Sequence, residues 1–268
     1  MANSPVLVLA SGQRCGSTLV QRLLSSHPDV LIWGEHAGQL RPLLAAVSRM
    51  KVWAEEDGME ARNEFEDGGY QSFMANLTPE VEWIDEALRQ FLTTLFADRA
   101  AAQGKSIWGI KEVRYGLPEA CAMHHLFPGA VVIQLVRDPR DVLRSLDLWE
   151  RQSQWWNRRK TELAMQDWLR ITESFLHSTA EMSPPVLRLR YEDLTADPAM
   201  AMKMIGAHTS LDPAKFDPDV FKRKIHITGP NGDSPRTPAD WNALPPSLRA
   251  LLDDDDVRMA AAACGYDL

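Results

Sequence analysis

The feature that most constrains the fold is a short apolar run, followed at once by a glycine-containing loop and a helical pattern. Residues 6–10 read Val-Leu-Val-Leu-Ala, a continuous run typical of strands buried in a parallel sheet. The loop at 11–16 reads Ser-Gly-Gln-Arg-Cys-Gly. Apolar residues then recur at helical spacing through 19–24, until His27-Pro28 ends the pattern. The order predicted is strand, loop, helix.

Further short apolar segments predict strands, and helical patterns separate them. The segments are residues 30–33, 106–110, 130–136 and 186–190. Alternating strands and helices favour a parallel sheet with right-handed crossovers. We therefore expect an α/β fold with about four or five central parallel strands and helices on both faces. Because α/β folds of ~200–250 residues often form one domain, we expect residues 1–268 to form a single domain.

The insertion between the second and third expected strands, residues 36–104, has mostly helical patterns. It contains an acidic stretch at 55–69 and a good helical pattern from Pro79 to about Ala102. We expect this insertion to cover the face or rim of the sheet.

Composition and charge argue against several classes of protein. Lys and Arg number 29 against 37 Asp and Glu, so the net charge of −8 disfavours a nucleic-acid partner. The three cysteines and seven histidines show no metal-ligand spacing, so we expect neither a disulfide framework nor a metal site. The apolar run at 5–10 is far shorter than the ~20 residues that span a bilayer. We expect a soluble, cytoplasmic protein with no membrane partner.

The loop after the first strand is a degenerate phosphate-binding loop. Against the Walker pattern GxxxxGK[ST], residues 11–18 keep Gly16 and Thr18 but carry serine in place of the first glycine and of the lysine. Backbone N–H groups at the helix N-terminus and the hydroxyls of Ser17 and Thr18 can bind an anion, and Arg14 supplies a cation. The missing lysine argues against a magnesium triphosphate. The alternative is a turn that merely starts a helix.

A second candidate anion site follows the strand at 130–136. Arg137 leaves the strand, Asp138 can cap a helix, and Pro139 suits its first position, with Ser145 two turns along. Alone, this pattern can be just a capped helix start. Next to the first loop on the same parallel sheet, this pattern indicates a second phosphate-binding site.

These motifs resemble those of the sulfotransferases. Ser-Gly-Gln-Arg-Cys-Gly-Ser-Thr-Leu at 11–19 resembles their 5′-phosphosulfate loop, and Leu-Val-Arg-Asp-Pro-Arg-Asp-Val-Leu-Arg-Ser at 135–145 resembles their 3′-phosphate motif. Arg-Tyr-Glu-Asp-Leu at 190–194 is similar to a recurrent family segment. The segments at 239–244 and 263–267 are similar to the C-terminus of carbohydrate and tyrosylprotein sulfotransferases.

The resemblance implies a P-loop-related sulfotransferase fold and a sulfuryl donor, 3′-phosphoadenosine 5′-phosphosulfate (PAPS), with PAP as product and no metal. The acceptor would be a carbohydrate, a small molecule or a peptide tyrosine. Binding of the donor is implied for the loop residues and for the residues of the second motif, namely Arg14, Cys15, Gly16, Ser17, Thr18, Arg137 and Ser145.

The resemblance also implies catalytic roles. Glu35 is the expected general base, at the end of the second strand and beside the first loop, with His36 as the competing base. Lys111 resembles a family lysine that stabilises the leaving oxygen, a role shared with Arg14; an exposed, salt-bridged lysine is the alternative. Glu112 and Arg114 flank the site, and either can orient the acceptor.

Three other features are left with open alternatives. Tyr191 packs on the nucleotide or is a core tyrosine. The loop at 226–237 matches a donor-covering segment by position only, with Arg236 as a candidate contact. We expect Trp168 in the core, and one of the pair Trp155-Trp156 at a pocket rim.

Two other functions compete with sulfuryl transfer. A small-molecule kinase would use ATP and magnesium on the same scaffold, and a non-enzymatic nucleotide-binding protein would make Glu35 and Lys111 incidental.

Overall fold

The computed structural model describes residues 4–177, 183–222 and 244–268. In these ranges five strands form one parallel sheet, in the order β2-β3-β1-β4-β5. The predicted α/β fold with a parallel sheet is confirmed. The strands are β1 (Val6–Ala10), β2 (Val30–Trp33), β3 (Ile107–Glu112), β4 (Val131–Val136) and β5 (Val186–Arg190).

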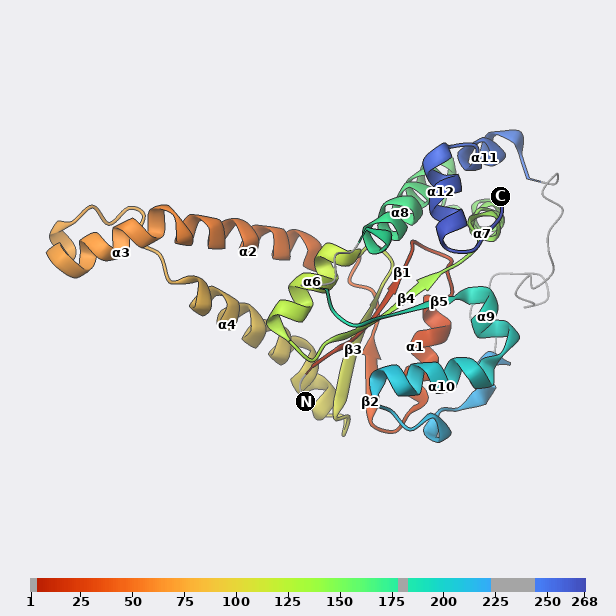
Figure 1. Cartoon of the computed structure of the whole chain (residues 1–268), viewed down its shortest axis with the longest axis horizontal. Helices are drawn as coiled ribbons and strands as arrows, with labels where there is room; N and C mark the ends of the chain where they lie inside the picture. Colours follow the sequence, from red (N-terminus) through yellow and green to blue (C-terminus); the bar gives the residue numbers. More distant parts are fainter. Residues whose placement is uncertain (1–3, 178–182, 223–243) are drawn as a thin grey trace.

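Helices lie on both faces of the sheet (Figure 1). Those outside the insertion are α1 (Ser17–Ser26), α6 (Leu117–Leu126), α7 (Pro139–Gln152), α8 (Arg158–Leu176), α9 (Tyr191–Ala196), α10 (Pro198–Thr209), α11 (Pro246–Arg249) and α12 (Asp255–Ala263). The insertion holds α2 (Leu40–Glu55), α3 (Asp57–Gly68), α4 (Val81–Leu92), the π-helical turn η2 (Thr93–Ala97) and α5 (Asp98–Ala101). Short 3₁₀ turns are η1 (Gly69–Gln71), η3 (Pro213–Lys215), η4 (Pro218–Phe221) and η6 (Ala250–Leu252).

The sheet has a hydrophobic cluster on each face, because successive side chains of a strand point to opposite sides. Val6 and Val8 of β1 belong to the cluster that also contains residues of α1, α10 and α12. Leu7 and Leu9 belong to the cluster formed with residues of α4, α5 and α6. Helix α8 contributes to both clusters. All of β1 is buried, as its continuous apolar sequence predicts.

The insertion only partly covers the sheet. Leu92, Phe96 and Ala100 pack in the second cluster, so its C-terminal end does cover a face. Helices α2 and α3 instead form, with α4, an arm that projects away from the sheet (Figure 1). The expectation that the insertion covers the face or rim of the sheet is therefore confirmed only for the parts of the insertion that pack in this cluster. Only the first part of α2 packs on the second cluster, through Leu40, Leu43 and Val47, and most of the length of this helix is exposed.

Candidate active site

The loop between β1 and α1 adopts a conformation that depends on glycine. Gly16 caps α1 with φ of 90°, in the left-handed region that side chains disfavour. A Cβ atom there would lie 2.3 Å from Cδ2 of Tyr191. The loop thus packs directly against this tyrosine, and the first backbone N–H groups of α1 remain available to an anion.

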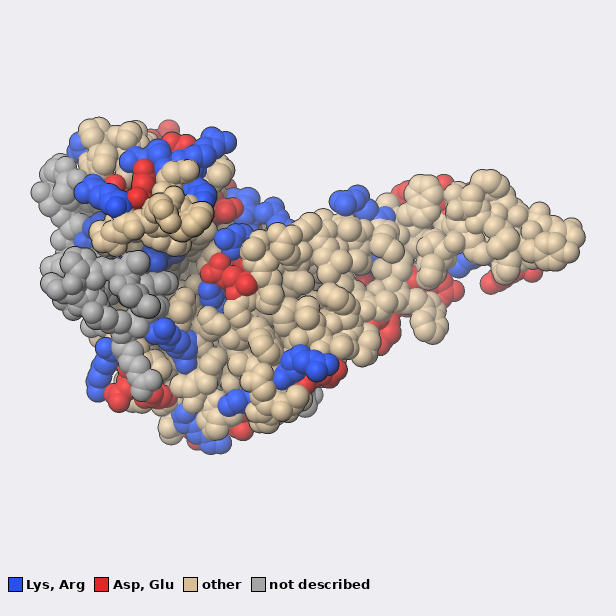
Figure 2. Space-filling model, turned by 180° about the vertical axis from the view of Figure 1, so that it is seen from behind, with Lys and Arg blue, Asp and Glu red and all other residues tan. Residues whose placement is uncertain are grey.

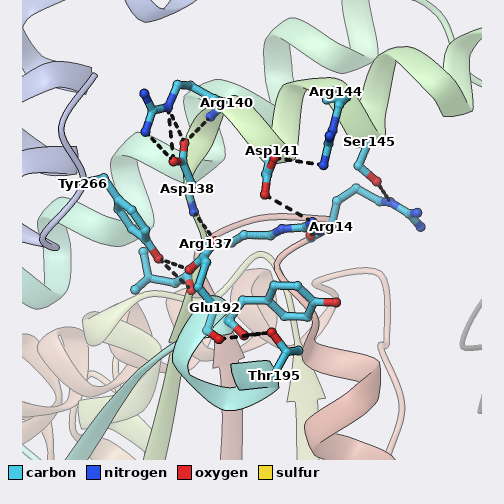
Figure 3. Close-up of polar contacts among 12 residues, drawn as sticks. Arg14, Arg137, Asp138, Arg140, Asp141, Arg144, Ser145, Glu192, Thr195 and Tyr266 are labelled. Atoms are coloured by element: carbon cyan, nitrogen blue, oxygen red, sulfur yellow. Dashed lines mark hydrogen bonds and ion pairs between the residues drawn. The ribbon is translucent and has the colours of Figure 1, made fainter. Parts of the chain in front are cut away.

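Two arginines meet at this loop, as Figure 3 shows. Nε of Arg14 donates a hydrogen bond of 2.8 Å to Oγ of Ser145, and its guanidinium lies 5.3 Å from the ring centroid of Trp149. Nη1 of Arg137 donates a hydrogen bond of 2.9 Å to the carbonyl oxygen of Arg14. Burial and then the charge of Arg137 lower the pKa of Arg14. The cluster therefore concentrates positive charge between the loop and α7.

Arg137 is oriented by its neighbours but keeps free donors. Its side chain is 6% exposed, and its guanidinium carbon lies 4.3 Å from the ring centroid of Tyr191. Nε and Nη2 are buried without a hydrogen bond, although Nη2 lies 3.7 Å from Asp141. Buried donors normally have acceptors, so these atoms indicate that an anionic ligand belongs here.

The start of α7 is fixed by a network that reaches the end of the chain (Figure 3). The Asp138 carboxylate accepts a hydrogen bond of 2.8 Å from the backbone N–H of Arg140, and Pro139 occupies the first helical turn. Glu192 accepts from the Asp138 backbone N–H at 3.2 Å and from the Tyr266 hydroxyl at 2.7 Å. The predicted capped helix is confirmed, and Tyr266, which follows α12, is linked through Glu192 to the backbone beside Arg137.

The second half of the site lies at the ends of β2 and β3. Nζ of Lys111 donates a hydrogen bond of 2.6 Å to Oε1 of Glu35, and Nη1 of Arg114 donates one of 2.9 Å to Oε2. Burial alone would raise the pKa of Glu35, but the hydrogen bonds and charges of Lys111 and Arg114 outweigh burial and lower it. Lys111 is buried and ion-paired, so it is not the exposed surface lysine that was the alternative.

Strand order corrects one expectation about Glu35. Its strand β2 does not neighbour β1, because β3 lies between them. Lys111 is paired in register with Val8 of β1, so Lys111 lies between Glu35 and the strand that leads into the loop. The expected neighbour relation of β1 and β4 is confirmed, which brings the two arginine-bearing loops together.

The contacts of Glu112 and His36 do not favour the functions considered for them, which were orienting the acceptor for Glu112 and acting as the base for His36. The fully buried Glu112 carboxylate accepts backbone N–H groups of His36 at 3.2 Å and Gly38 at 2.8 Å, and it also accepts those of Val113 and Arg114. Glu112 therefore ties the segment after β2 to the end of β3. The His36 ring packs edge-on against Phe96, and burial lowers its pKa. Of the two candidate bases, only Glu35 contacts Lys111.

Other predicted residues have mixed outcomes. Cys15 is buried, its thiol donates to the carbonyl of Ser11, and burial raises its pKa to about 12, so the thiol does not face a ligand. Ser17 and Thr18 begin α1 as predicted. Arg236 and the rest of the 226–237 loop lie outside the described residues.

The predicted core position of Trp168 is confirmed, whereas a pocket-rim position for Trp155 or Trp156 stays a prediction. Trp168 is fully buried, and its indole N–H donates to the Arg137 carbonyl at 3.1 Å. Trp155 is 76% exposed, whereas Trp156 stacks on Trp149 with centroids 4.5 Å apart. The stack therefore extends from the guanidinium of Arg14 along α7.

Sequence reasoning did not identify several residues that complete the site. The contact of Trp149 with Arg14 and the hydrogen bond of Tyr266 to Glu192 had been assigned no role. Glu192 and Tyr266 both fall within segments similar to those of the family, and that was the only signal for them.

The described ranges contain neither a cluster of metal ligands nor a helix suited to a membrane. No cluster of three or more metal-ligating side chains occurs there. No helix there has both the length and the hydropathy needed to cross a bilayer.

Comparison with known proteins agrees with this geometry. Residues 5–215 match the profile described as "Sulfotransferase family". No curated protein matches the chain. A structure titled "Sulfotransferase Domain from the Synechococcus PCC 7002 Olefin Synthase" is similar with a TM-score of 0.54 and 21% identity, covering 99% of this chain and 96% of that one.

A second solved structure supports the same fold. The "Sulfotransferase Domain from the Curacin Biosynthetic Pathway" has a TM-score of 0.52 at 17% identity and covers 99% of each chain. The family match extends from β1 beyond α10, and it includes both arginine-bearing loops, Glu35 and Lys111. The chain therefore belongs to the sulfotransferase family and is a sulfotransferase.

Proposed function

We propose that this chain, acting as one domain over residues 1–268, transfers a sulfuryl group from PAPS to a hydroxyl of an acceptor and releases PAP. The observation that carries the proposal is the hydrogen bond between Arg14 and Ser145. It joins the loop after β1 to α7, so a ligand with anionic groups at its 5′ and 3′ positions can engage both at once. A nucleoside triphosphate carries its anionic groups at the 5′ position alone.

The residues present fit such a ligand. The N-terminus of α1, with Ser17 and Thr18, would hold the 5′-phosphate, and Arg137 with Ser145 would hold the 3′-phosphate. The buried, unbonded Nε and Nη2 atoms of Arg137 are the donors that a phosphate would satisfy. Tyr191, packed between Gly16 and Arg137, would flank the nucleotide, and Arg236 is a further proposed contact.

Glu35 and Lys111 would carry the chemistry. Oε1 of Glu35 would take the proton of the acceptor hydroxyl as the acceptor oxygen bonds to sulfur and the bond between sulfur and the 5′-phosphate oxygen breaks. Lys111, helped by Arg14, would stabilise the charge on that leaving oxygen. In the structure Lys111 donates a hydrogen bond to Oε1 of Glu35. A shift of Lys111 toward the leaving oxygen would therefore free Oε1 to accept the proton. Arg114 would keep Oε2 in place.

A thermal-shift titration tests the sulfuryl-donor site. A ligand that binds only the folded state raises the melting temperature by mass action. We expect adenosine 3′,5′-bisphosphate to raise it and ATP with magnesium to have little effect. A shift with ATP and magnesium alone would overturn the proposal in favour of a kinase, and no shift with either nucleotide would contradict the proposed donor site.

A further inference from the structure

Although Ile84 and Leu88 of α4 are buried, the arm exposes several large apolar side chains. Trp83 is 67% exposed and Met50 is 54% exposed, with Trp53 and Phe91 close behind at 49% each. In α3 and the outer half of α2, the buried residues are Ala54, Gly58 and Ala61. Helices in a folded protein normally do the reverse. On the face seen in Figure 2, the arm is largely uncharged, with acidic and basic groups along its margins.

A groove between α2 and α4 collects these side chains. A cavity of 370 Å³ adjoins a second of 340 Å³, and Met50 lines both. The first is lined by apolar residues only, among them Leu43, Val47, Met50, Trp83, Ala87 and Phe91. Together the cavities follow α2 from Leu43 to Trp53, a length of ~15 Å at the rise of an α-helix.

The spacing along the groove is that of a helix-packing surface. Leu43, Val47 and Met50 are separated by four and three residues, and Trp83, Ala87 and Phe91 by four each. Such rows pack against helices, as the anchors of a helix in a groove or of a helical bundle do. The two antiparallel helices of this arm form half of such a bundle.

We propose that the groove is filled by the arm of a second copy of this chain, with α2 of each copy beside α4 of the other. A two-fold interface uses the same surface on both copies, so it needs a surface that is complementary to itself. This surface carries charges of both signs. Arg49 on α2 has no ion-pair partner within the described residues, and neither do Glu80 and Glu82 at the start of α4. A two-fold pairing of α2 with α4 brings these opposite charges together twice.

The charges of the arm also argue against a membrane as the occupant. The acidic residues of α3 and of the start of α4 would be repelled by an anionic bilayer surface. A pairing of two arms would bury the tryptophans and Phe91 in a four-helix core, which the arm cannot build alone. The proposal does not depend on the assigned donor or acceptor.

Molecular mass in solution tests the pairing. We expect the full chain to sediment at twice the mass of one copy and to dissociate on dilution. Trp83→Glu and Phe91→Glu should each raise the dissociation constant about thirtyfold or more, as for central aromatic residues of interfaces. Met259→Glu is the matched control, because Met259 is 64% exposed on α12, outside the arm, and its variant should stay dimeric.

Charge reversal checks the proposed pairing of helices. Arg49→Glu and Glu82→Lys should each weaken the dimer, and an equimolar mixture of the two variants should restore it, since opposite charges then face each other in both halves. Circular dichroism should show unchanged helix content in every variant. A wild-type chain with the mass of one copy at all concentrations, dimers unaffected by the arm variants, or a mixture no tighter than its components would overturn the proposal.

Discussion

Lys111 donates a 2.6 Å hydrogen bond to Glu35, and this contact joins the ends of the neighbouring strands β2 and β3. Arg114 holds the other carboxylate oxygen of Glu35. The carboxylate is therefore kept ionised by two cations, and the lysine that faces it is itself buried. In the proposed mechanism, an anionic donor bound at the neighbouring loop would attract Lys111 away from Glu35, and the carboxylate would then be free to accept the proton of the acceptor hydroxyl.

Replacing the proposed base should separate chemistry from binding. Glu35→Ala should lower kcat by about 100-fold or more, in the range of general-base effects, while the affinity for adenosine 3′,5′-bisphosphate stays close to that of the wild type. Steady-state kinetics and calorimetric titration of the nucleotide measure the two quantities. Unchanged kcat would remove Glu35 from the reaction.

The pH dependence of kcat/KM should show the effect of the neighbouring cations on the pKa of Glu35. Its folded-state pKa is lowered below 4.5, so the ionised base persists as pH falls until that lowered value is reached. Arg114→Gln removes one hydrogen bond and one charge, so the pKa should rise and the acid limb of kcat/KM should move to higher pH. Arg41→Gln serves as control, because Arg41 pairs with Glu119 instead. An acid limb that stays in place would contradict the ion-pair arrangement.

Arg137 should act on nucleotide affinity. Arg137→Ala removes Nε and Nη2, the two buried donors that have no acceptor in the structure. Loss of a charge-assisted hydrogen bond should weaken adenosine 3′,5′-bisphosphate binding roughly tenfold to 150-fold. Arg151→Ala on α7, the helix that follows Arg137, is the matched control, since this arginine is 61% exposed and pairs with Asp147. Equal effects on nucleotide affinity in both variants would argue against a specific phosphate contact.

Gly16→Ala should damage both stability and binding. A methyl group at this positive φ costs roughly 1–2 kcal/mol and would also clash with the ring of Tyr191. We expect a lower melting temperature and a loss of the nucleotide-induced shift. Gly104→Ala isolates the backbone cost, because Gly104 also has positive φ but nothing lies within 4 Å of its added Cβ. A Gly16 variant no worse than the Gly104 variant would show that the loop does not need the close approach.

Much of the fold followed from local patterns. The buried strand β1 and the helix after Gly16 were predictable because both signals lie within a few consecutive residues. Asp138 and Pro139 likewise specify the start of α7 through their own backbone chemistry. Such features depend on glycine conformations, caps and apolar spacing, which a sequence displays directly.

The arm and the order of strands were not predictable in this way. The helical patterns within 36–104 are present, but they do not show whether the helices pack on the sheet or project from it. The sequence also does not show that β3 lies between β1 and β2, because the same apolar runs are compatible with several strand orders.

By itself, the sequence determined the strand-loop-helix units, the two arginine-bearing loops and the type of residue at each proposed catalytic position. The tertiary structure alone decided that Lys111 lies between Glu35 and β1 and that Glu192 links Tyr266 to the start of α7. It also decided that α2, α3 and α4 form an arm that projects from the sheet. The physical reason is range. A cap or a left-handed glycine is a property of adjacent residues, whereas contacts between distant segments depend on how all the apolar faces of the chain are buried together.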